Sequence, residues 1–210
     1  WSGYNWYKGN AQSLIQINTE FPIYIDRAVD LGCHEGYPGH HAYNALLEKS
    51  LVKDKGWTEF SVYPLYSPMS LIAEGSANYG IEMAFSERER LAFERDVLFP
   101  MAGLDPKLAK KYADLRMLLG KLSYADNDAA MNYLNGKWTK EQTIDWLVNV
   151  QLYPPEKANQ RVSFYDGLRG YVINYNLGKD LVAKYVERHV TSRNPATAKA
   201  QKWAAFKQLL

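Results

Sequence analysis

Apolar residues follow a helical spacing over most of this chain. Beyond residue 67 they recur every three or four positions, in segments separated by prolines, glycines and capping residues. This pattern predicts helices over 68–86, 87–99, 106–135, 140–152, 156–176, 179–191 and 195–209. The fold class that follows is mainly α, a multi-helix core with a small β element near the N-terminus.

The N-terminal third is less regular. Residues 13–19 alternate apolar and polar side chains and include β-branched residues, which predicts a strand. Pro38 and Gly39 interrupt a helical pattern, because proline removes a backbone donor and clashes with the preceding turn. We expect an irregular entry over 1–10, helical segments over 23–37 and 40–51, and a loop over 52–66.

Three helix starts carry capping signals. Ser67-Pro68 and Asp105-Pro106 each place a capping residue before a proline at the first helical position. Thr139 and Gln142 have the spacing of a capping box.

Composition and charge exclude several classes of protein. The 210 residues include 25 basic and 23 acidic side chains, so the net charge of +2 gives no reason to expect a nucleic-acid partner. No apolar run approaches the ~20 residues of a membrane span. Cys33 is the only cysteine, which excludes an internal disulfide. The sequence starts at Trp1 instead of methionine, so we expect it to be part of a longer chain.

Candidate chemistry is concentrated in residues 34–41, His-Glu-Gly-Tyr-Pro-Gly-His-His, which hold three of the four histidines. Imidazole is the commonest protein ligand for metals, and a glutamate directly after the first histidine is the usual base of a zinc hydrolase. On a regular helix His34 and His40 would lie ~120° apart, so they could not share an ion. A bulge at Pro38-Gly39 would bring them together and favours His40 over His41, although the spacing leaves both open.

Glu74 is the best candidate for a third ligand. Its neighbours are small or apolar, and a buried carboxylate is costly unless it is paired or bound to a metal. Asn78, one turn further on, is a candidate hydrogen-bond partner for a ligand. Gly75 is expected to let this helix pack closely against the helix that carries His34.

With these motifs the sequence resembles a bacterial family catalogued as domain of unknown function 885, which is similar to the gluzincin metallopeptidases. The family's His-Glu-x-x-Pro-Gly-His-His motif matches residues 34–41, and its Glu-Gly-x-Ala-x-Tyr motif matches 74–79. In a third motif, Gln-x-x-x-Tyr-x-x-Gly, Tyr175 and Gly178 match but Tyr171 replaces the glutamine. Ser76 also stands where tryptophan is common, and these departures bear on substrate preference.

The resemblance implies a gluzincin-like core in which residues 1–210 form a single catalytic-type domain, the C-terminal part of a longer chain. It implies Zn²⁺ held by His34, His40 and Glu74, with Glu35 activating a zinc-bound water to hydrolyse a peptide. Tyr175, and after it Tyr171, are the candidate donors to the oxyanion. A missing N-terminal helical region would pack on this domain, and many members are exported to the periplasm or cell surface.

Two other hypotheses of function fit parts of the sequence pattern. One is a non-catalytic module that binds peptide or glycan on its aromatic side chains, with a structural or vestigial metal site. The other is an Fe(II) oxygenase, since two histidines and one carboxylate also suit that metal. Glu35 has no evident role in oxygenase chemistry, which ranks that reading third.

Overall fold

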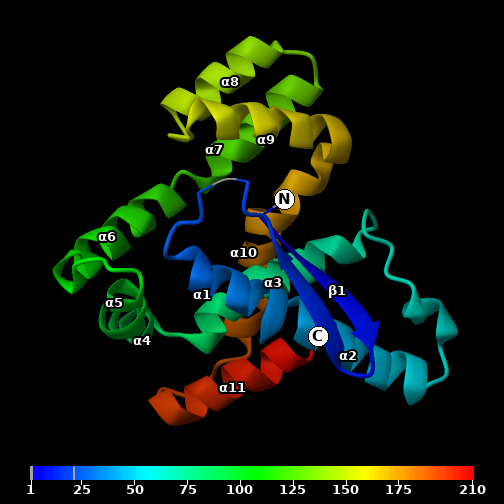
Figure 1. The fold of residues 1–210 in the computed structure, drawn as a ribbon. Helices are drawn as coiled ribbons and strands as arrows, with labels where there is room; N and C mark the ends of the chain where they lie inside the picture. Colours follow the sequence, from blue (N-terminus) through cyan, green and yellow to red (C-terminus); the bar gives the residue numbers. More distant parts are fainter. Residues whose placement is uncertain (1, 21) are drawn as a thin grey trace.

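The computed structural model describes residues 2–20 and 22–210. In this part of the chain, helices surround a crossed pair of helices at the centre, residues 69–84 and 173–188 (Figure 1). The one sheet in this part of the chain is a two-stranded hairpin of β1 (Gly3–Gly9) and β2 (Gln12–Ile17). The mainly α class with a small N-terminal β element is therefore confirmed.

Most helices lie close to the predicted segments, although the segment predicted over 106–135 is divided at residues 121–122. In chain order they are α1 (Arg27–Leu31), α2 (His40–Leu47), α3 (Met69–Ala84), α4 (Glu87–Phe93), α5 (Phe99–Met101), α6 (Ala109–Gly120), α7 (Ser123–Leu134), α8 (Lys140–Asn149), α9 (Pro155–Leu168), α10 (Ile173–Arg188) and α11 (Pro195–Lys207). Short π-helical turns at Gly32–Gly36, Glu48–Lys53 and Glu94–Leu98, and 3₁₀ turns at Thr58–Ser61, Pro106–Leu108 and Arg169–Val172, extend or connect them.

The expected irregular entry over 1–10 is wrong for the residues described, and Trp1 lies outside them. Residues 3–9 form β1, which pairs with β2 in antiparallel register. The reversal is made by Gly9, Asn10 and Ala11, all with positive φ, a conformation that glycine and asparagine adopt more readily than most residues. Cross-strand pairing orders a segment whose glycine and asparagine content alone favours a loop.

Two of the three predicted caps are confirmed. Asp105 accepts from the Lys107 amide, and Thr139 and Gln142 form both hydrogen bonds of the capping box. The Ser67 cap is wrong: Pro68 directly precedes α3 in helical conformation, and no side chain caps that end.

The predicted helix over 156–176 is divided in the structure. α9 ends at Leu168 because Arg169 takes a φ of 53°, outside the right-handed helical region. A 3₁₀ turn follows, and α10 begins at Ile173, so the predicted gap at 177–178 lies inside a continuous helix.

α3 and α10 cross at two glycines. A Cβ on Gly75 would lie 2.4 Å from the carbonyl carbon of Gly178, and one on Gly178 would lie 2.5 Å from the Leu71 oxygen. The predicted close approach at Gly75 is real, but its partner is α10 and not the helix of His34. The sequence could not identify that partner, which lies more than 100 residues away.

Buried apolar side chains form two clusters, one on each side of this crossing. The first joins α7, α8 and α9 in the upper part of Figure 1, and the second joins α3, α10 and α11. Their largest fully buried side chains are Tyr165 and Phe206, respectively. Burial of this apolar surface fixes α3 and α10 in the middle of the molecule.

Candidate metal centre

The chain leaves the helix between the two candidate histidines and returns. After the π-helical turn Gly32–Gly36, Tyr37 is extended, and α2 begins at His40. The Gly39 amide donates to the Cys33 carbonyl at 2.9 Å, which closes the loop. A Cβ on Gly39 would lie 1.9 Å from the His34 oxygen, so only glycine fits here. This bulge removes the angular mismatch of the six-residue spacing.

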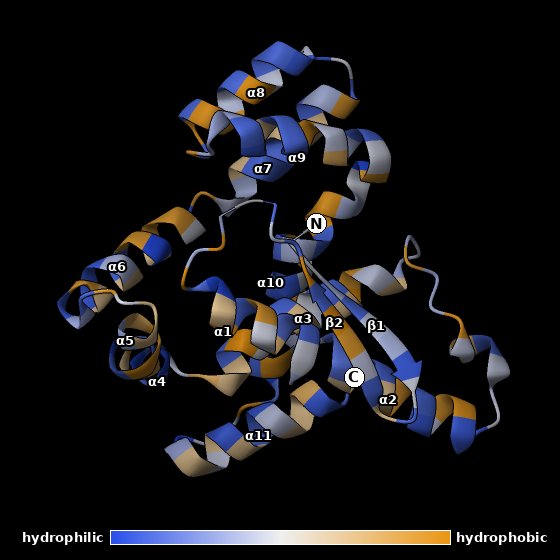
Figure 2. Ribbon diagram, in the orientation of Figure 1, coloured by the Kyte–Doolittle hydropathy of each residue, from blue (hydrophilic) through white to orange (hydrophobic). Residues whose placement is uncertain are grey.

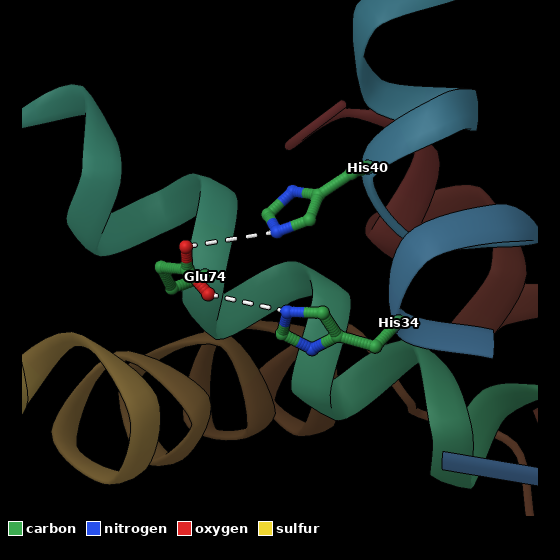
Figure 3. Close-up of side chains that lie close together, drawn as sticks. All are labelled: His34, His40 and Glu74. Atoms are coloured by element: carbon green, nitrogen blue, oxygen red, sulfur yellow. Dashed lines mark ion pairs between the residues drawn. The ribbon is translucent and has the colours of Figure 1, made fainter. Parts of the chain in front are cut away.

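Three elements bring the candidate ligands together: the π-helical turn carries His34, α2 begins at His40, and α3 carries Glu74 (Figure 3). The Glu74 carboxylate lies between the two rings, with Oε2 3.3 Å from His34 Nε2 and Oε1 3.6 Å from His40 Nε2. One ligand atom from each residue lies within 4.8 Å of the others. The structure thus brings together all three residues predicted as ligands.

The donor atoms fit a metal ion. Ligand atoms at the usual ~2.1 Å from a tetrahedral zinc lie about 3.4 Å apart, a separation within the 4.8 Å that spans the three donor atoms. Glu74 is only 6% exposed, and its Oε2 is buried without a hydrogen bond among the described residues. The nearest partners of this carboxylate are the two imidazole rings, and a cation shared with their Nε2 atoms would offset the cost of its burial. This group of residues could hold a metal ion.

The remaining nitrogen of His34 is fixed by Asn78. His34 Nδ1 lies 3.0 Å from Asn78 Oδ1, and Asn78 Nδ2 donates to the Tyr175 carbonyl at 2.8 Å. The second bond orients the amide so that its oxygen faces the ring. In the neutral ring His34 Nδ1 then carries the proton, and the Nε2 lone pair would be directed at a metal in the centre.

His41 is not part of the centre. Its Nδ1 is hydrogen-bonded to Ser13 Oγ at 2.8 Å, and its Nε2 to the Tyr37 hydroxyl at 3.0 Å. Both ring nitrogens are therefore engaged, and His41 ties β2 to the loop between the ligands. Of the two histidines that the spacing left open as the second ligand, the structure therefore favours His40.

Glu35 lies beside the centre and is also buried, at 4% exposure. Its Oε1 is 4.0 Å from His34 Nε2, and its Oε2 makes no hydrogen bond in the described part of the chain. β1 covers this residue, since Asn5 Nδ2 donates to the Glu35 carbonyl at 2.6 Å and Gly3 packs against its side chain. The arrangement holds a carboxylate next to the ligands without committing it to another partner.

Glu74 and His40 at the centre shift each other's pKa values. Burial alone would raise the pKa of Glu74, but the adjacent His34 and His40 hold it below its usual value. Burial would lower the pKa of His40, yet Glu74, with a smaller contribution from Glu35, raises it overall. The two shifts share one cause, the attraction between the Glu74 carboxylate and the His40 ring.

Both predicted tyrosines lie near the centre, in different positions. The Tyr171 hydroxyl donates to Glu74 Oε1 at 2.7 Å. The Tyr175 ring lies 5.9 Å from that of Tyr171, and its hydroxyl makes no hydrogen bond to any described residue. Burial, followed by the negative charge of Glu74, raises the pKa of both phenols, so both remain protonated donors.

Sequence reasoning missed further tyrosines around Glu74. The Tyr66 ring meets that of Tyr171 edge-on at 6.0 Å, and Tyr63 donates to Ser70 in the first turn of α3. Burial, and to a lesser degree Glu74, raises the pKa of Tyr63 to about 12. The clustered aromatics in 52–66 were the available signal, but no spacing linked them to Glu74. The charge of Glu74 also acts on Tyr4, on β1, but the sequence around Tyr4 gave no signal of that proximity.

Comparison with known proteins adds no relatives: no protein-family model, curated protein or solved structure matches this chain. Within residues 2–20 and 22–210, no helix combines the length and the apolar run needed to cross a membrane. The chemistry of the site therefore has to be inferred from its own residues.

Proposed function

We propose that this chain carries the active site of a zinc metallopeptidase, which hydrolyses peptide bonds. The observation that carries the proposal is the convergence of His34 Nε2, His40 Nε2 and the Glu74 carboxylate, with the buried Glu35 carboxylate directly beside them. Two imidazoles and one glutamate are a common ligand set of catalytic zinc, which leaves a coordination position open.

Zinc, when bound, would act as a Lewis acid on the substrate carbonyl and increase the acidity of water at the site. The chain's own residues account for the remaining steps. Glu35 is placed to take a proton from the attacking water and to pass it to the amine that leaves. Glu35 is buried, and its Oε2 makes no hydrogen bond to any described residue, which keeps it available as a base.

The two tyrosines divide the remaining tasks. Tyr171 donates to Glu74 and so holds that ligand in position. The Tyr175 hydroxyl, without a hydrogen-bond partner among the described residues, is the available donor to the oxygen that gains negative charge as water adds to the carbonyl.

The first test is the metal content of purified protein, measured by elemental analysis for wild type, His34→Ala and Glu74→Ala. Near-stoichiometric zinc in wild type, falling in both variants, supports the site. A folded wild type that takes up no zinc after supplementation overturns the proposal.

The second test separates catalysis from binding. Glu35→Gln should retain zinc while hydrolysis of a peptide mixture falls at least about 100-fold, the contribution typical of a general base. Equal hydrolysis by Glu35→Gln would rule out the assigned base. Peptide or glycan binding without hydrolysis by zinc-loaded wild type would favour the binding-module reading.

A further inference from the structure

Arg161, on α9, is a fixed cation with one open edge. Its Nε lies 2.9 and 3.0 Å from the two Asp126 carboxylate oxygens, and its Nη2 also donates to that carboxylate. The guanidinium carbon lies 4.5 Å from the Phe164 ring centre and 6.0 Å from that of Tyr175. Its Nη1 makes no hydrogen bond to any described residue, and the side chain is 20% exposed. An arginine held in this way presents donors without losing side-chain freedom on binding.

Lys157 lies one helical turn before Arg161, on the same side of α9. Its Nζ is 4.1 Å from the Tyr153 ring centre, and no described carboxylate lies within ion-pair distance of it. The two acidic groups whose charge acts on Lys157 are already engaged, Asp126 by Arg161 and Asp26 by the Tyr112 hydroxyl at 2.7 Å. Surrounding protein atoms, then the positive charges of Arg27 and Arg161, lower the pKa of Lys157. An anion bound here would relieve that repulsion.

Tyr171 and Tyr175 connect this cationic pair to the candidate metal centre. Tyr171 touches Glu74, the Tyr175 ring lies 5.9 Å from the Tyr171 ring, and the Arg161 guanidinium lies 6.0 Å from the Tyr175 ring. Each step is a direct neighbour contact. A ligand that extends from the centre across Tyr175 would therefore meet Arg161 first, with Lys157 one helical turn away.

We propose that Lys157 and Arg161 form a subsite for a carboxylate of the substrate peptide. The carboxylate would come from a free C-terminus or from an acidic side chain, and the guanidinium and ammonium groups would bind it by charge-assisted hydrogen bonds. The subsite deepens the proposed function, on which it rests, because it assigns the substrate class as peptides bearing a carboxylate at a fixed distance from the cleaved bond.

Binding is measured by calorimetry, which needs no turnover. Zinc-loaded Glu35→Gln and metal-free wild type are each titrated with three N-acetylated hexapeptides. One has a free C-terminus, one is its C-terminal amide, and one is the amide with a glutamate at the penultimate position. We expect the free acid to bind at least about tenfold more tightly than the neutral amide. Tight binding of the glutamate peptide would identify an acidic side chain as an alternative source of the carboxylate.

Lys157→Met removes the charge but keeps the length of the side chain, and it should reduce the carboxylate preference several-fold. Lys184→Met, an exposed lysine on α10, is the matched control and should leave the preference unchanged. Arg161→Lys, which retains a cation for Asp126, should weaken it as well. Equal affinity for acid and amide, no binding of either, or an undiminished preference in Lys157→Met would overturn the inference. A carboxylate preference in a protein that hydrolyses no peptide would contradict the proposed catalysis and leave the subsite intact.

Discussion

His34 and Asn78 are joined by a hydrogen bond of 3.0 Å between a ring nitrogen and an amide oxygen, and the same amide donates to the backbone of α10. A candidate ligand on one side of the centre is thus oriented by a residue of α3 that is itself held by α10. The crossing of α3 and α10 therefore determines the direction of the His34 lone pair as well as the position of Glu74.

Asn78→Ala removes this orientation without touching a ligand atom. Zinc affinity should fall about 10- to 100-fold, as for other partners that orient a metal-binding histidine. Competition with a chromogenic chelator measures the change. Asn78→Asp keeps an oxygen acceptor toward His34 Nδ1 and should lose less affinity. Equal affinity in wild type and Asn78→Ala would mean that the hydrogen bond does not matter for metal binding.

The adjacent histidines 40 and 41 should respond differently to substitution. His40→Ala removes a ligand nitrogen, so bound zinc should be lost while the protein stays folded. His41→Ala should keep stoichiometric zinc, because both of its nitrogens bind protein groups. It should lower the free energy of unfolding by roughly 1–3 kcal/mol, since the buried His41 ring and its two hydrogen bonds are lost. Elemental analysis beside thermal unfolding separates the two effects, and loss of zinc from His41→Ala would reverse the assignment.

Much of the candidate centre could be predicted from sequence because its signals are local. The Pro38-Gly39 pair explains how His34 and His40 converge, and the small apolar neighbours of Glu74 indicated that it points inward. Other features depend on contacts between distant segments. Gly75 signals close packing but not its partner Gly178, and Tyr63 and Tyr66 approach Tyr171 or Glu74 only after the chain has folded. The sequence of β1 alone does not predict a strand, because its extended conformation depends on pairing with β2.

Gly178→Ala tests the α3–α10 crossing. The new methyl group would lie 2.5 Å from the Leu71 carbonyl oxygen, so the two helices would have to separate. Overpacking of this kind costs about 1–3 kcal/mol of unfolding free energy, measurable by denaturant titration. Because Glu74 and Asn78 lie at the same crossing, zinc affinity should fall too.

The matched control is Gly167→Ala on α9, where an added Cβ meets no atom within 4 Å. An open helical glycine replaced by alanine should gain roughly 0.5–1 kcal/mol. If Gly178→Ala were as stable as this control, the close contact of the two helices would be contradicted.

Glu48 attaches the turn of the hairpin to the end of α2. Its Oε2 accepts from the Tyr7 hydroxyl at 2.5 Å and from the Asn10 amide at 3.0 Å, and Lys53 Nζ lies 3.2 Å from its Oε1. These contacts, led by the Tyr7 hydrogen bond, hold the pKa of Glu48 below its usual 4.5. β1 in turn covers Glu35, so this carboxylate helps to keep the proposed base enclosed.

The sign of the pH dependence follows from that lowered pKa. Ionised Glu48 stabilises the docked hairpin fully above about pH 4.5, and this contribution is lost as the pH falls through the lower pKa of the folded state. Hydrogen exchange of β1 amides should therefore be faster in Glu48→Gln than in wild type at pH 6, and the difference should narrow at pH 3.5. Amides of α3 serve as the internal control, because Glu48 does not contact them. Equal β1 protection in the two proteins at pH 6 would show that the hairpin is held by its apolar contacts, and Glu35 would then remain covered at any pH at which the helices stay folded.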